Sequence, residues 1–118
     1  MKQFDPKQLG FFTGTTAYHL HAPRVVLTDG AKYVAKHAEA YWLMDAISSY
    51  LPALVNREHF VVASLAVKNQ SALLWITDGN YKDIASQRIP YTDFPMPNIT
   101  LFACWATDYW VLMLPSEY

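Results

Sequence analysis

Cysteine and long apolar runs are scarce in this sequence. Cys104 is the one cysteine among 118 residues, so neither an internal disulfide nor a cysteine-rich zinc site can form. Such usage suits a reducing compartment. No apolar run approaches the roughly 18 residues of a membrane span, and the N-terminus lacks the apolar core of a signal peptide. We therefore expect a cytoplasmic protein that does not enter a membrane.

Charge and glycine are scarce as well. Charged residues make up 16% of the chain, against about 25% in an average globular protein, and the formal net charge is −1. Without a basic excess, nucleic acid is a poor partner. The four glycines form no phosphate-binding loop, and no serine lies in a Gly-x-Ser-x-Gly motif. We therefore expect no cofactor, and an interaction protein rather than an enzyme.

Apolar and aromatic residues, in contrast, are abundant. Apolar residues make up 53% of the chain, which contains four Trp, eight Tyr and six Phe. A domain of this size has too little interior to hide all of these rings. We expect some of them to form an exposed patch of the kind that marks an interface.

The chain reads as a single domain over residues 1–118. It contains no repeat, no low-complexity tract and no Gly/Ser linker that would divide it. The first ten residues suggest a loosely ordered arm. Residues 11–18 and 24–27 are rich in β-branched or aromatic side chains, and they predict two short extended segments.

One long amphipathic helix is predicted from Gly30 to about Leu51. This segment is rich in Ala, Lys, Leu and Met, and Thr28 or Asp29 can cap its first N–H groups. Pro52 should end the helix, because the residue before a proline is pushed away from helical geometry. The second half is apolar nearly all round, which implies burial on more than one side.

Strands dominate the rest of the chain. Alternation, short apolar runs and turn residues predict five of them, at residues 58–68, 71–77, 81–89, 99–106 and 109–114. Strands grouped on one side of a helix in the sequence are typical of an α+β fold. We therefore expect one long amphipathic helix packed on a mainly antiparallel sheet of five to seven strands.

Four ordered blocks of residues carry a resemblance to a known family. They are Phe12-Thr13-Gly14-Thr15 with Tyr18 nearby, Thr28-Asp29-Gly30-Ala31-Lys32-Tyr33, Ala40-Tyr41-Trp42-Leu43-Met44-Asp45-Ala46-Ile47 and Ile89-Pro90-Tyr91-Thr92-Asp93-Phe94-Pro95. Together they resemble a family of small bacterial, plasmid and phage proteins known only as a domain of unknown function. The resemblance implies a mobile element or a bacterial accessory gene, and it carries over no activity and no catalytic residue.

Three polar residues of the predicted helix form one candidate site. His37, Tyr41 and Asp45 follow one another at i, i+4 steps, and the helical projection places Asp45 on the face expected to meet the sheet. A carboxylate buried there could act as a tuned acid or base beside an imidazole and a phenol. The structural alternative is an Asp that accepts hydrogen bonds and holds the helix on the sheet.

Two histidines form a second candidate site. His19 and His21 alternate with Leu20, so in an extended segment their side chains point to one side and could bind a metal ion together. A third ligand would have to come from His37, His59 or a carboxylate through the fold. Exposed loop histidines are the simpler interpretation.

Aromatic residues near the predicted strand ends form a third candidate site, a binding surface. These residues are Trp75, Tyr91, Phe94, Trp105, Tyr109 and Trp110. One helix covers only one face of a sheet, and the strands at 60–67 and 101–106 have too few polar residues for a wet second face. We therefore expect a homodimeric protein-binding module, an accessory or inhibitor protein of a mobile element. The alternative is a small enzyme or ligand-binding domain with a pocket around Asp45, His37 and Tyr41.

Overall fold

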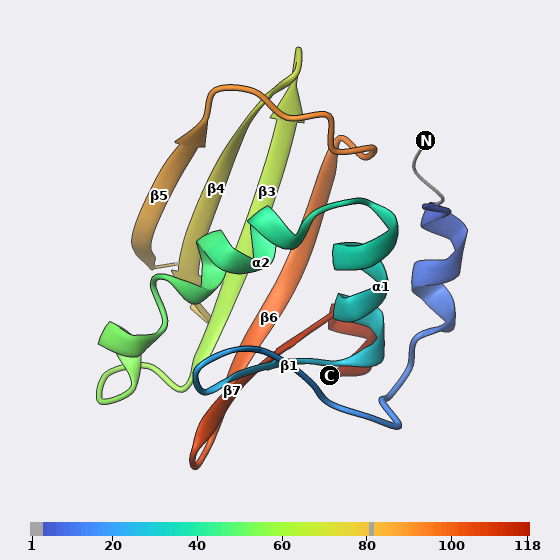
Figure 1. Ribbon diagram of the computed structural model, residues 1–118. Helices are drawn as coiled ribbons and strands as arrows, with labels where there is room; N and C mark the ends of the chain where they lie inside the picture. The colour runs from blue at the N-terminus through green and yellow to red at the C-terminus, as the bar shows by residue number, and fades with distance from the viewer. Residues whose placement is uncertain (1–3, 81) are drawn as a thin grey trace.

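The computed structural model describes residues 4–80 and 82–118, and these residues form a seven-stranded sheet with two α-helices on one of its faces (Figure 1). The elements are β1 (His19–Ala22), β2 (Val25–Leu27), α1 (Asp29–His37), α2 (Tyr41–Ser48), β3 (Phe60–Lys68), β4 (Ser71–Asp78), β5 (Asp83–Ile89), β6 (Asn98–Ala106) and β7 (Tyr109–Met113). Three short 3₁₀ helices, η1 (Pro6–Phe11), η2 (Pro52–Leu54) and η3 (Pro115–Glu117), complete the described part of the chain.

The strands lie in the order β1-β2-β7-β6-β3-β4-β5. Strands β2 and β7 run parallel and the other neighbours run antiparallel, so the sheet is mixed. Asn69 and Gln70 make the tight turn between β3 and β4 with φ of 54° and 63°, which suits the right-handed twist of a hairpin. The predicted α+β class is confirmed, with a mixed sheet in place of a mainly antiparallel one.

The predicted single long helix is wrong, because the chain forms two short helices instead. Thr28 caps α1 as predicted, its Oγ1 accepting a hydrogen bond from the N–H of Ala31 at 3.2 Å. The helix stops at His37, and Glu39 takes a left-handed φ of 51° before α2 begins at Tyr41. No proline or glycine marks this break. The change of direction, visible in Figure 1, turns the apolar side of α2 toward the strands.

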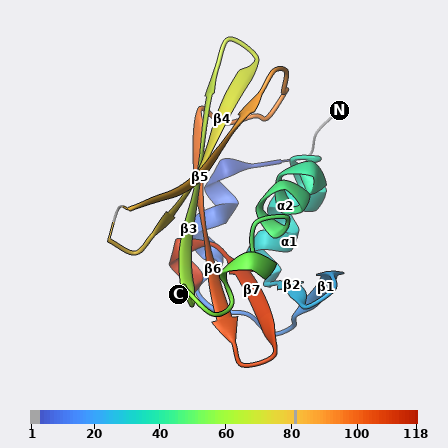
Figure 2. The ribbon, with the colours of Figure 1, turned by 90° about the vertical axis from the view of Figure 1, so that its left-hand side faces the viewer.

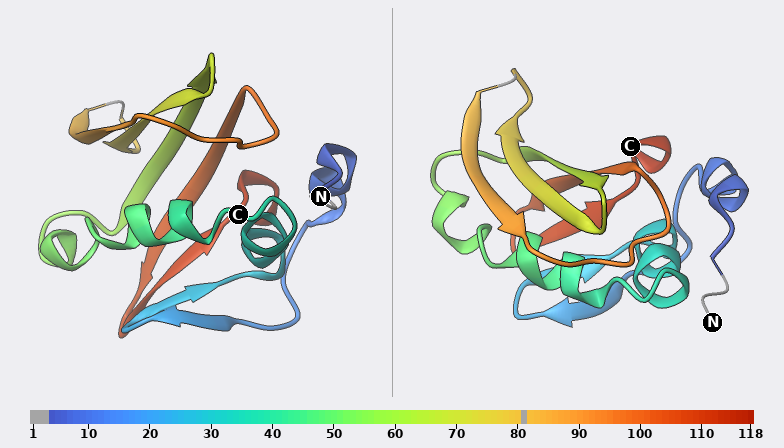
Figure 3. Two further views of the ribbon diagram at one scale, coloured as in Figure 1. Left: turned by 45° about the horizontal axis from the view of Figure 1, so that its top comes forward. Right: turned by 90° about the horizontal axis from the view of Figure 1, so that it is seen from above.

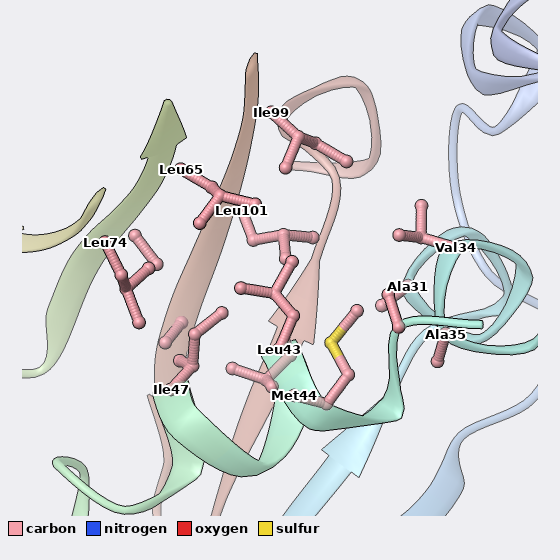
Figure 4. Packing of buried hydrophobic residues seen from close by; sticks show 14 of the residues in the cluster. Ala31, Val34, Ala35, Leu43, Met44, Ile47, Leu65, Leu74, Ile99 and Leu101 are labelled. Atoms are coloured by element: carbon pink, nitrogen blue, oxygen red, sulfur yellow. The ribbon is translucent and has the colours of Figure 1, made fainter. Parts of the chain in front are cut away.

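The core lies between the helices and the sheet (Figure 4). From α2, Leu43, Met44 and Ile47 point toward strand residues that include Leu65 and Leu101, and all five side chains are buried. Each such side chain contributes roughly 1.5–3 kcal/mol through burial. If one straight helix ran through residue 51, the apolar side of residues 41–48 would point away from the sheet that α1 packs on. Packing against the sheet therefore overrides helix propensity here.

The N-terminal region differs from the expected strand at residues 11–18. Part of the predicted arm forms η1, and residues 12–18 contain no strand. The ring of Phe4 lies 5.7 Å from that of Tyr33 and 6.5 Å from that of Phe94, so this region packs on the domain. Residues 1–3 lie outside the described part of the chain. None of the helices in the described ranges combines the length and apolar character that a membrane crossing needs.

Figure 2 shows strands β3 to β5 with α1 and α2 on one side of them, and Figure 3 shows the same layering from two further directions. We call the side that faces α1 and α2 the inner face and the opposite side the outer face. Neither α-helix covers the outer face.

Candidate functional site

The outer face is apolar along its central strands. On β3, Val61, Ala63 and Leu65 are buried beneath the helices, while Phe60 and Val62 alternate with them and point outward. The neighbouring β6 places Phe102 opposite Val62 and Cys104 opposite Phe60. Where one face of a sheet is in contact with water, the side chains that point to that face are normally polar. Here the uncovered face carries two phenylalanines and a valine side by side.

A groove of about 530 Å³ opens on this face. Phe60, Val62, Trp75 and Phe102 contribute its apolar wall, and Asp83 lies at its rim. The rings of Phe60 and Phe102 are 5.0 Å apart in an edge arrangement, a geometry favoured by aromatic quadrupoles. The groove could receive an apolar or aromatic side chain, and the carboxylate at its rim favours a positive group beside it.

The C-terminal residue lies against the same aromatic pair. The Tyr118 ring is 5.2 Å from that of Phe60 and 5.5 Å from that of Phe102. Glu117 holds this end of the chain, because its carboxylate accepts hydrogen bonds from the Thr28 hydroxyl at 2.6 Å and the Gly30 N–H at 3.0 Å. The start of α1 therefore fixes where the terminal tyrosine meets the outer face.

Charges lie at the two ends of this face. Asp83 pairs with Thr77 of β4, which pairs with Val62, so Asp83 and Val62 lie in one row across the sheet. Arg88 lies in the row of Ala66 in the same way, through Leu73. Arg88 and Lys68 both line a second hollow. Trp75 lies between these ends with its side chain 38% exposed. The outer face is therefore acidic at one end and basic at the other, with Trp75 between the two charges and with Phe60 and Phe102 at the acidic end.

The amino-acid sequence matches one family over nearly the whole chain. The sequence model of DUF6876, a family of unknown function, matches residues 4–118. The chain belongs to this family. No curated protein and no solved structure is significantly similar to it. Membership in DUF6876 confirms the resemblance to a domain of unknown function, while the bacterial, plasmid or phage origin stays a prediction.

The structure does not form the predicted helical ladder of His37, Tyr41 and Asp45. The break after His37 puts it on a different helix from the other two, and its ring packs at a tilt against that of Tyr33 with ring centroids 4.6 Å apart. The Asp45 side chain is 73% exposed, so its expected position facing the sheet is wrong. The change of helix direction at Glu39 causes this shift, because it rotates α2 relative to the predicted projection.

His21 of β1 is the group that lies next to Asp45 in this DUF6876 chain. Its Nε2 is 2.8 Å from Oδ1 of Asp45, and no hydrogen bond joins these two atoms. The ring also stacks against that of Tyr41 at 6.1 Å. An exposed carboxylate with one buried histidine is a docking contact between β1 and α2, and it forms no enclosed pocket for a reaction.

His19 and His21 both lie on β1, on either side of Leu20, which is 80% exposed, and the pairing of β1 with β2 shifts between Leu20 and Ala22. Each histidine meets its own carboxylate, since Nε2 of His19 lies 2.9 Å from Oδ1 of Asp29. Within residues 4–80 and 82–118, no group of three or more His, Cys, Asp or Glu side chains could hold a metal ion.

Asp29 is the most strongly held carboxylate of this region. Its Oδ2 accepts hydrogen bonds from the N–H and the hydroxyl of Thr16, both at 2.9 Å, and its Oδ1 contacts His19. The pKa of Asp29 lies far below its usual range. The hydrogen bond from the Thr16 N–H has the largest effect, followed by those from the His19 side chain and the Thr16 hydroxyl. These contacts tie the loop before β1 to the start of α1.

The six predicted aromatic residues do not share one surface. Phe94 and Trp110 are buried, and Trp105 packs on Trp110 with ring centroids 5.5 Å apart. Tyr91 is exposed between β5 and β6. Trp75 and Tyr109 are exposed on β4 and β7, which three strand spacings separate. The outer-face residues that this prediction missed are Phe60, Phe102 and Tyr118. Alternation within the predicted strands could have found the two phenylalanines.

Cys104 also lies on the outer face, opposite Phe60. Partial burial raises the pKa of its thiol, so the thiolate form is disfavoured. This position agrees with a cysteine that acts as a small apolar side chain.

Proposed function

We propose that this protein is a non-enzymatic interaction module that works as a homodimer, with the outer face buried between two copies. The observation that carries the proposal is the apolar row of Phe60, Val62 and Phe102, which lies on a face that neither α-helix covers and on which only the Tyr118 ring packs among the described aromatic rings. Apolar side chains on an open sheet face gain free energy when another sheet covers them, at about 25 cal/mol per Å² of apolar area.

The size of the outer face supports this use. Strands β7, β6, β3, β4 and β5 follow one another in the sheet. With strands about 4.8 Å apart and about seven residues of about 3.4 Å each, their projected area is roughly 600 Å². A standard interface buries about 800 Å² of accessible surface on each partner. The projected area of the face is therefore of the same order as the surface that a dimer interface buries on each partner.

The alternative of a small enzyme or ligand-binding domain has less support. It needs a pocket around Asp45, His37 and Tyr41, whereas the first of these is largely exposed and the second is on another helix. An accessory or inhibitory role for a mobile element stays a prediction from the family resemblance.

Light scattering coupled to size-exclusion chromatography tests the proposal. The wild-type protein should have about twice the chain mass of 13.5 kDa. Val62→Lys should give a folded monomer, because burying an unpaired ammonium group between two sheets is very costly. Ala53→Lys adds the same charge on exposed η2 and should leave the dimer intact. A wild-type protein that is monomeric at the highest concentration it tolerates would overturn the proposal.

A further inference from the structure

The charges of the outer face define how a second copy would lie on it, an inference that rests on the proposed function. The strands register residues into rows across the sheet. One row contains Val62, Thr77 and Asp83, and another contains Ala66, Leu73 and Arg88. These rows are four residues apart along β3, or about 14 Å. Asp83 and Arg88 are therefore too distant to pair within one protomer.

The row midway between the two charges contains Thr100, Ser64, Trp75 and Ser86. We propose that the protein forms a face-to-face dimer whose two-fold axis runs along this row, across the strands. Rotation about such an axis places each residue opposite the residue equally far on the other side of the row. Asp83 of each copy then faces Arg88 of the other, and the interface contains two identical ion pairs.

The same axis explains two further features of the face. Trp75 lies on it and meets its own symmetry mate at the centre of the interface, where tryptophan contributes most to binding. Lys68 and Phe60 lie on β3 at equal distances from the axis, on opposite sides of it. Each Lys68 would therefore lie over the aromatic groove of the other copy, where an ammonium group is attracted to the ring faces.

A two-fold axis along the strands would also bring the outer faces together, but it is disfavoured by charge. An axis along β3 would lay β5 of one copy on β7 of the other, because each is two strands away. Asp83 would then meet Met113, which is in the row of Val62. A carboxylate desolvated against an apolar side chain costs several kcal/mol. Of these two axes, the one across the strands gives both Asp83 and Arg88 of β5 an opposite partner.

A charge-swap experiment tests this arrangement, with the dimer dissociation constant measured by analytical ultracentrifugation at low salt. Arg88→Asp and Asp83→Arg should each raise the constant by about tenfold or more, because each turns two attractive contacts into repulsive ones. The double variant Asp83→Arg/Arg88→Asp should restore it to within about threefold of wild type, since the pairs are re-formed with exchanged partners. Lys36→Asp, the same charge change on exposed α1, should leave the constant unchanged.

A second measurement keeps the test decisive if a charge variant does not fold. In a Cys104→Ser background, Ser64→Cys lies on the axis and should be cross-linked by a short bismaleimide into a covalent dimer. Ala66→Cys is one row away from the axis, and its symmetry mate is about 14 Å further along the strand. The same reagent should therefore not cross-link Ala66→Cys. Efficient cross-linking of Ala66→Cys instead, or charge variants with wild-type dissociation constants, would overturn this arrangement. Provided that Val62→Lys still abolishes the dimer, either result would leave the proposed function standing. A monomeric wild-type protein would overturn both.

Discussion

Single carboxylates hold the start of α1 in place. Glu117 accepts hydrogen bonds from the Thr28 hydroxyl and from the N–H of Gly30, and Asp29 follows the capping residue directly. Negative groups at a helix N-terminus satisfy free N–H donors and interact favourably with the helix dipole. A side chain on Gly30 would collide with Glu117 and Leu114, with a Cβ at 2.5 Å from the carboxylate oxygen. Residue 30 is therefore a glycine because the C-terminus packs there.

The bonds to Asp29 predict how stability depends on pH. The pKa of Asp29 is lower in the folded state than its value of about 3.9 in the unfolded state. Its contribution to the free energy of unfolding is therefore fully present well above the unfolded pKa. This contribution is lost as the pH falls through the unfolded pKa toward the folded pKa. Asp29→Asn should lower the free energy of unfolding at pH 7 and flatten its decline between about pH 5 and pH 2. Urea unfolding at a series of pH values measures both effects.

Asp108→Asn serves as the matched control for that experiment. Asp108 is an exposed residue of the turn between β6 and β7. The control should follow the wild-type curve, because no hydrogen bond from residues 4–80 or 82–118 to the Asp108 side chain is observed. Parallel curves for Asp29→Asn and wild type would contradict the role assigned to the Thr16 and His19 contacts.

At the scale of elements, the sequence predicted strands far better than it predicted the helix. Strands β3, β4, β6 and β7 match the predicted segments within two residues at each end, since alternation and turn residues are local signals. The helix break at Glu39 has no such signal. It arises because Leu43 and Ile47 must reach the sheet, and this depends on contacts between distant parts of the chain.

The turn between β3 and β4 allows a prediction at this scale. Gln70 has a positive φ of 63°, a conformation that costs a non-glycine residue roughly 1 kcal/mol. Its backbone carbonyl accepts a hydrogen bond from the N–H of Thr92, which a substitution of the side chain leaves in place. Gln70→Gly should therefore raise the free energy of unfolding by about 0.5–1 kcal/mol, measured by urea denaturation.

Gln70→Ala is the control for the turn, since it removes the same polar atoms and keeps the Cβ. It should give no comparable gain. Equal stabilisation by both substitutions would show that the side chain of Gln70, and not its backbone conformation, limits stability at this position.

At the scale of the whole molecule, the sequence indicated an uncovered apolar face but not its residues. Excess aromatic content and one helical layer predicted such a face. Which rings occupy it depends on strand order and register, and these place Phe60 beside Phe102 from segments 42 residues apart in the chain. Trp110, one of the predicted surface rings, lies inside because β2 pairs alongside β7. Such parallel pairing has no local sequence signal.

A homodimer that unfolds to separate chains should become more heat-stable as its concentration rises, because dilution favours the dissociated state. Each tenfold increase in concentration adds about 1.4 kcal/mol to the stability of the dimer. Two chains of 118 residues unfold with an entropy of about 0.5 kcal/mol/K at roughly 2.1 cal/mol/K per residue, so Tm should rise by about 3 °C per tenfold.

Differential scanning calorimetry over a hundredfold range of protein concentration measures this dependence. Val62→Lys supplies the comparison, since a monomer should have a Tm that does not change with concentration. The difference between the two slopes separates dimer formation from any direct effect of the substitution on the fold, which would shift Tm equally at every concentration. A wild-type Tm that is as insensitive to concentration as that of Val62→Lys would mean that the outer face stays exposed in the folded protein.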